Sequence, residues 1–163
     1  MLAGNYEKSC KINKTLTDLV ESIADRALGA AGQHFCGNLE NAITNYEYVL
    51  KKAPHFSSWV KYLYGYALTE QRAYDKALDF FETELQKKHS WSGTEQTMYI
   101  LSAFIKIKQG KEKEAYVLFE KQRELDGKGK TAKRIKGELF GLRNKTFLTE
   151  LLNTLAPLGL PDN

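Results

Sequence analysis

The sequence contains few prolines, which break helices, and few cysteines, which stabilise small domains through disulfides. It has three prolines and two cysteines among 163 residues. Two cysteines are too few for a disulfide scaffold, and Cys10 and Cys36 are too far apart for a metal knuckle. We therefore expect both to be reduced in a cytoplasmic protein. The histidines, His34, His55 and His89, have no second ligand at metal-binding spacing, so we expect no metal and no cofactor.

The chain also lacks an uncharged apolar run long enough to span a bilayer. Its longest apolar segment, 16–31, is interrupted by four charged residues: Asp18, Glu21, Asp25 and Arg26. The first fourteen residues lack the apolar core and small-residue cleavage site of a secretory signal. We expect no membrane insertion, and a flexible N-terminal segment over 1–14.

What the sequence does contain is a helical pattern. Hydrophobic residues make up 42% and charged residues 27% of the chain, a balance typical of globular proteins. Apolar residues recur every three or four positions, which is the helical period. The sequence therefore predicts an all-α fold with helices over 15–35, 38–52, 56–71, 74–88, 94–108, 111–125, 131–142 and 146–156.

A repeat runs through the central part of the chain. Three alanines are each followed four residues later by an aromatic residue, and each has a small residue twelve positions earlier. The alanines lie 35 and 38 residues apart. Small residues at these positions let two antiparallel helices approach closely. The predicted signature residues are Ala30, Ala42, Tyr46, Gly65, Ala77, Phe81, Ala103, Ala115 and Phe119, with Pro54 ending the first unit.

The segments AITNYEYVLKKAP, AYDKALDFFETEL and GKEKEAYVLFEKQ resemble the tetratricopeptide repeat (TPR) family, whose unit is a helix–turn–helix of about 34 residues. The resemblance extends over roughly 23–126. It implies an α-solenoid of three TPR units, about 23–56, 58–91 and 96–129, within a single domain over 15–163. The sequence departs from the family pattern at the usual tryptophan–leucine–glycine opening, of which Trp59, Tyr64 and Gly65 remain, and at Lys106, where an aromatic residue is typical.

After residue 127 the alanine signature ends, and we predict a C-terminal helical cap over 131–156. An open solenoid needs a cap to cover the apolar face of its last unit. The expected buried residues of the cap are Leu139, Phe140, Leu142, Phe147, Leu148, Leu151, Leu152 and Leu155. The ending LLNTLAPLGLPDN, with Leu158, Gly159, Leu160, Pro161 and Asp162 as the matching residues, is similar to the tails of bacterial signalling proteins whose repeats follow a cyclase or DNA-binding domain.

The first helices of stacked pairs line a concave surface. Helical spacing predicts a partner-binding groove with apolar and aromatic residues on this surface: His34, Trp59, Tyr62, Tyr66, Thr69, Ile100, Phe104 and Ile107. Aromatic residues dominate interface energetics, which favours a partner peptide or helix. The alternative is that these side chains pack between neighbouring helices.

A basic run follows the repeats, with Glu138 as the one acid between 128 and 145. It comprises Lys128, Lys130, Lys133, Arg134, Lys136, Arg143 and Lys145. Such a run is either a patch for an acidic partner, nucleic acid or membrane surface, or a solvated helix face. We favour the solvated face, and consider nucleic acid an unlikely partner, because the net charge of +4 is modest.

No arrangement of residues in the sequence indicates catalysis. The leading hypothesis is a non-catalytic scaffold or adaptor that binds another protein in the concave groove. One alternative is a regulatory or self-association tail of a larger bacterial signalling protein. The other is a binder of nucleic acid or an anionic surface through 128–145.

Overall fold

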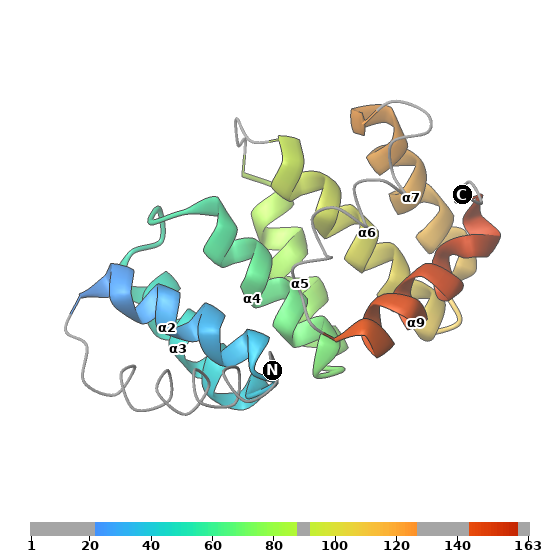
Figure 1. The fold of residues 1–163 in the computed structure, drawn as a ribbon. Coiled ribbons are helices and arrows are strands. Elements are labelled where there is room, and N and C mark those ends of the chain that lie inside the picture. The colour runs from blue at the N-terminus through green and yellow to red at the C-terminus, as the bar shows by residue number, and fades with distance from the viewer. Residues whose placement is uncertain (1–21, 88–91, 127–143, 160–163) are drawn as a thin grey trace. The chain divides into compact units, whose positions relative to one another are not determined.

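A computed structural model of the chain describes residues 22–87, 92–126 and 144–159. Within these ranges the chain forms seven α-helices and one short 3₁₀-helix, with no strand. This confirms the all-α prediction (Figure 1). The chain divides between Ala67 and Leu68 into two compact units, which are described separately below.

The first unit contains α2 (Ile23–Phe35), α3 (Leu39–Lys52) and most of α4 (Ser58–Glu70). The side chain of Ser22 caps α2 by accepting a hydrogen bond of 3.0 Å from the backbone N–H of Asp25. An N-cap serine satisfies one of the free N–H groups at a helix start. The helix predicted over 15–35 therefore begins at Ile23, and residues 15–21 lie outside the described ranges.

Small residues bring α2 and α3 together. Ala27, Ala30 and Ala42 are fully buried, as expected for alanines that allow close helix approach. Asn45 of α3 donates a hydrogen bond of 3.0 Å to the side-chain oxygen of Gln33 of α2. The first two of the predicted helices thus pack as a pair.

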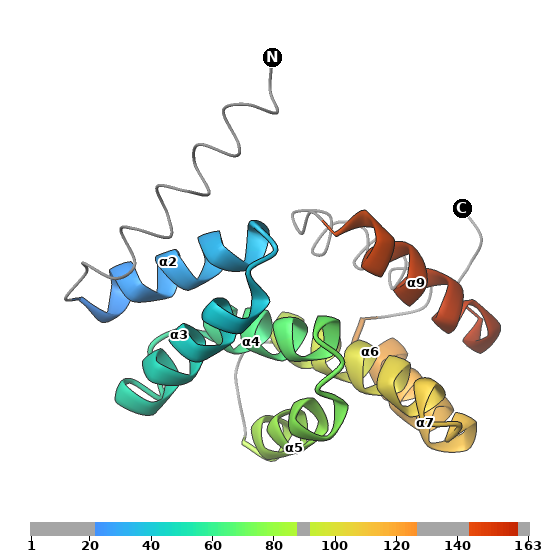
Figure 2. The same ribbon diagram turned by 90° about the horizontal axis from the view of Figure 1, so that it is seen from below.

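The second unit is built around α6 (Ser92–Lys108). This helix packs against α5 (Tyr74–Leu85), α7 (Glu112–Asp126) and α9 (Lys145–Leu155), and a 3₁₀ turn, η1 (Ala156–Leu158), follows α9. Because three helices cover it, α6 is buried on nearly all sides from Gln96 to Ile105. In Figure 2, α9 lies on the side of α6 that faces away from α5.

The three helix–turn–helix connections share one backbone conformation. Gly37, Arg72 and Gly110 each have a positive φ, of 78°, 64° and 73°. The residue after each positive-φ residue donates a backbone hydrogen bond to the carbonyl five positions before itself. Examples are Asn38 to Gln33 (2.9 Å) and Lys111 to Lys106 (2.8 Å). This is the Schellman pattern that ends helices. The turns lie 35 and 38 residues apart, like the alanines, so the sequence repeat is a repeat of local structure.

The predicted signature residues lie in the core, with one exception. The alanines and aromatic residues that define the repeat are less than 2% exposed: Ala30, Ala42, Tyr46, Ala77, Phe81, Ala103, Ala115 and Phe119. Gly65 is also buried, whereas Pro54 is exposed in the connection between α3 and α4. The helix termini from α3 onward agree with the prediction to within three residues.

The predicted cap is described only in part. Residues 131–142 lie outside the described ranges, together with Leu139, Phe140 and Leu142. The remaining predicted residues lie on α9, where Phe147, Leu151 and Leu155 are buried and Leu148 and Leu152 are half-buried. A helix is therefore present where the leucine pattern predicts the second of the two, and its role as a cap stays a prediction.

Two further expectations concern the membrane and the cysteines. Among the described residues, no helix has the length and apolar character required to cross a bilayer.

Cys36 is disulfide-bonded. The expectation of reduced cysteines is therefore wrong for this residue, and Cys10 lies outside the described ranges. Spacing in the sequence cannot exclude a disulfide, because it does not determine which cysteines the fold brings together.

Candidate functional site

The residues predicted to line a concave groove differ in accessibility. Five of the eight are less than 5% exposed: His34, Tyr66, Thr69, Ile100 and Phe104. Trp59, Tyr62 and Ile107 are half-buried. In the first unit, the ring of Tyr66 contacts those of His34 and Tyr62, with centroid distances of 5.6 and 6.4 Å. The buried members form part of the core, and a role in binding stays a prediction for the half-buried ones.

Phe104 shows why part of this surface is inaccessible. Its ring meets Phe147 of α9 edge to face at 5.5 Å and Tyr74 of α5 at 6.4 Å. The ammonium group of Lys108 lies 5.4 Å from the same ring. The chain's own α9 therefore occupies the face of α6 on which the sequence predicted a partner.

Ion pairs and a hydrogen bond stabilise α9 in this position. Glu150 forms ion pairs with Lys108 at 2.7 Å and with Arg72 at 3.7 Å. Asn144 donates a hydrogen bond of 2.6 Å to the carboxylate of Glu70. The hydrogen bond from Lys108 holds the pKa of the Glu150 carboxyl below its usual value, because it stabilises the charged form.

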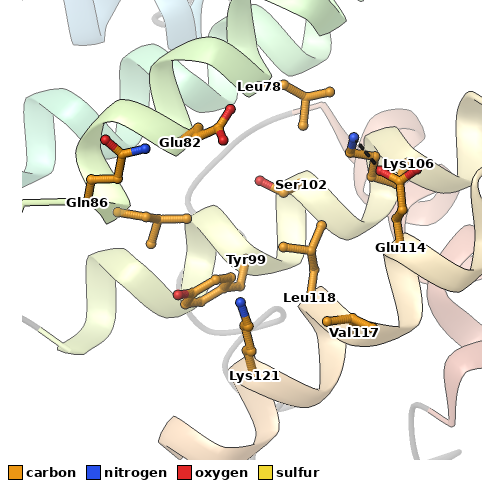
Figure 3. A pocket seen from close by; sticks show the side chains of 11 residues that line it. Leu78, Glu82, Gln86, Tyr99, Ser102, Lys106, Glu114, Val117, Leu118 and Lys121 are labelled. Atoms are coloured by element: carbon orange, nitrogen blue, oxygen red, sulfur yellow. Dashed lines mark ion pairs between the residues drawn. The ribbon is translucent and has the colours of Figure 1, made fainter.

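The opposite side of α6 carries an open groove. Its volume is about 540 Å³, within the range of pockets that bind ligands. Side chains from three helices line it (Figure 3): Leu78, Glu82 and Leu85 of α5 and Gln86 directly after it, Tyr99, Ser102 and Lys106 of α6, and Glu114, Val117, Leu118 and Lys121 of α7. Helical spacing places Tyr99, Ser102 and Lys106 about half a turn round α6 from Phe104 and Lys108.

The groove exists because α7 packs on α6 through only one of its faces. Ala115, Phe119 and Gln122 are fully buried there. The adjoining face of α7 presents Val117, which is 55% exposed although it is a large hydrophobic residue. Together with the leucines at 78, 85 and 118, it gives the groove an apolar lining. Exposed apolar surface within a concave site is typical of a binding surface.

Charged side chains on the groove are partly paired. The ammonium group of Lys106 lies 2.7 Å from the carboxylate of Glu114, and its hydrogen bond lowers the pKa of Glu114. By contrast, Glu82 on the α5 wall and Lys121 on the α7 wall are exposed and have no ion-pair partner among the described residues. The two walls thus present unpaired charges of opposite sign.

Neutral hydrogen-bonding groups also line the groove. Burial raises the pKa of the Tyr99 phenol, with a smaller contribution from Glu95, so this hydroxyl is a neutral hydrogen-bonding group at physiological pH. Ser102 and Gln86 add neutral polar groups. No group of three or more potential metal ligands occurs in the part of the chain that the structure describes.

The sequence does not predict this groove. The predicted concave surface comes from the first helix of each pair, whereas both walls of the groove, α5 and α7, are second helices. The available signal was the pair Tyr116 and Val117, which are 52% and 55% exposed and interrupt the polar face of α7. The predicted basic patch, Lys128, Lys130, Lys133, Arg134 and Lys136, lies outside the described residues.

A scan of protein-family models finds none that matches this chain. A search of curated proteins finds no match either.

Proposed function

We propose that this protein is a non-catalytic interaction module that binds a segment of another polypeptide in the groove lined by α5, α6 and α7. The observation that carries the proposal is the groove itself, with its apolar lining and the exposed Val117. Clustered apolar surface with a polar edge is the usual composition of a protein-binding surface. The groove thus replaces the face of α6 that α9 covers as the main candidate surface.

We also propose that the three helix pairs are TPR units of an α-solenoid. The recurring turn at Gly37, Arg72 and Gly110 supports this, because its spacing equals that of the signature alanines. Repeat proteins of this kind present extended surfaces for other proteins. A scaffold or adaptor role follows from such an architecture.

Two neighbouring residues of α7 provide a matched test. Val117 lines the groove, whereas Tyr116 does not, and both are about half exposed. Either can be replaced by lysine without disturbing the core. We would express tagged wild type, Val117→Lys and Tyr116→Lys in the native host and quantify the proteins that co-purify with each by mass spectrometry.

The proposal predicts that at least one polypeptide co-purifies with wild type and Tyr116→Lys, and is depleted at least about tenfold with Val117→Lys, because the new charge is desolvated on binding. Equal recovery with all three proteins would refute the groove as the binding surface.

A further inference from the structure

We infer that the occupant of the α5–α6–α7 groove is a two-turn segment of an amphipathic helix from another protein. Its apolar stripe faces α6, a basic residue faces Glu82, and an acidic residue faces Lys121. This inference rests on the proposed function and specifies the chemistry of the partner.

The walls of the groove favour a helix over an extended peptide. The floor and both walls of the groove are helices, whose backbone N–H and C=O groups are bonded within each helix except at its ends. Along most of its length the groove therefore offers side chains only, and an extended segment would find few backbone partners for its own N–H and C=O groups. A helix satisfies these groups internally and presents side chains alone.

The extent of the lining sets the length of the bound segment. Lining residues run from Leu78 on α5 to Gln86 just after its end, from Tyr99 to Lys106 on α6 and from Glu114 to Lys121 on α7. At about 1.5 Å per residue, each wall is roughly 10–12 Å long. Two turns of a partner helix, about seven residues, have the same length, which allows two or three apolar side chains on one stripe.

The unpaired charges determine the direction of the helix. Glu82 and Lys121 lie on opposite walls, so a helix with a basic and an acidic flank matches both charges in one direction. Turning it end to end exchanges its flanks and brings like charges together. Electrostatic complementarity of exposed groups contributes mainly to orientation and specificity.

The test uses three lactam-stapled helical peptides of fifteen residues with the same leucine stripe. One has lysines on one flank and glutamates on the other, the second has lysines on both flanks, and the third has glutamates on both. Each is titrated into the ¹⁵N-labelled full chain while amide resonances are followed by NMR. We expect the mixed peptide to shift groove resonances and to bind about two- to fivefold more tightly than either of the others.

A paramagnetic label on one end of the mixed peptide reports its direction. In wild type it should broaden resonances at one end of the groove. In the charge-neutral double variant Glu82→Lys/Lys121→Glu, broadening should move to the other end. Val117→Lys should weaken binding about tenfold and Tyr116→Lys should leave it unchanged.

Equal affinities for the three peptides, an unchanged broadening pattern in the double variant, or no groove shifts at millimolar peptide would each overturn the inference. The proposed function fails separately. If a native polypeptide still depends on Val117 for co-purification while the peptides fail, the groove binds a partner that is not such a helix.

Discussion

Tyr46 and Tyr64 lie edge to face in the first unit, 6.5 Å apart between ring centroids, but their hydroxyl groups differ. The Tyr64 hydroxyl donates a hydrogen bond of 3.1 Å to Glu47. The Tyr46 hydroxyl is buried without a hydrogen-bond partner among the described residues. A buried polar group without a partner opposes folding, whereas a bonded one contributes modestly to stability.

The two tyrosines therefore make a matched pair for substitution. Tyr46→Phe should leave the free energy of unfolding unchanged or raise it by up to about 1 kcal/mol, because it removes an unsatisfied hydroxyl. Tyr64→Phe should lower it by about 0.5–1.5 kcal/mol, because Glu47 loses its donor. Urea unfolding of both variants measures this difference, and a larger loss for Tyr46→Phe would contradict it.

The same residues predict alkaline sensitivity. Burial is the main cause that raises the pKa of both phenols above the ordinary value of 10.0, with contributions from Tyr62 at Tyr46 and from Glu47 at Tyr64. Above pH 10 the phenols lose their protons in the unfolded state before they do so in the folded state. Their contribution to the free energy of unfolding is therefore fully present below pH 10 and decreases above it. Each tyrosine contributes a slope of about 1.4 kcal/mol per pH unit.

Tyr46→Phe should make the pH dependence of unfolding less steep by that amount between about pH 10 and 11.5. Denaturant titrations across this range provide the measurement. Identical slopes for wild type and variant would show that Tyr46 does not titrate differently on unfolding.

The turn glycines give a prediction about backbone conformation. Gly110 has a φ of 73°, and a Cβ atom built there would meet nothing within 4 Å. Gly110→Ala should therefore destabilise through the left-handed conformation alone, by about 1–2 kcal/mol. Gly110→Asn should lose less, because asparagine tolerates this region better. Thermal unfolding compares the two, and an alanine variant as stable as wild type would contradict the argument.

At the scale of elements, α9 is held in place by three buried apolar residues, Phe147, Leu151 and Leu155, and by several partly exposed polar contacts. Phe147 is 6% exposed and packs on Phe104, whereas the ion pairs of Glu150 are partly solvated. Surface ion pairs contribute little, and buried aromatic residues contribute much. The attachment of α9 therefore depends mainly on its buried apolar residues, of which Phe147 is the one that packs on Phe104.

Phe147→Ala should release α9 while the other helices of the second unit persist. We expect a loss of about 3–5 kcal/mol in the stability of this attachment. Hydrogen–deuterium exchange should accelerate in 145–155 and remain slow in the middle of α6. Thr149→Ala, at an exposed site of α9, is the control. Unchanged protection of α9 in Phe147→Ala would contradict the central role of this residue.

The elements themselves were largely predictable from the sequence. The period of apolar residues predicted the helices, and Ala42, Ala77 and Ala115 predicted which faces are buried. The start of α2 at Ile23 was missed because the apolar pattern continues through Ser22, which caps the helix. Arg72 was missed as a turn residue because arginine carries no signal for a positive φ.

At the scale of the whole molecule, the site was much less predictable than the helices. A helical pattern shows that Phe104 faces other residues, but it cannot distinguish a partner from α9 of the same chain. The groove depends on how α5 and α7 flank α6, which is tertiary information. In the sequence alone, each of its charged residues, such as Glu82 and Lys121, looks like an ordinary solvent-exposed charge.

The proposed function requires that another polypeptide occupies the α5–α6–α7 groove. A photo-crosslinking amino acid at position 117, introduced in the native host, tests it most directly, with position 149 on α9 as the control. We expect an adduct from position 117 that contains a segment of a different protein, and none of that protein from position 149. An adduct with a second copy of this chain, or no polypeptide adduct from position 117, would contradict it.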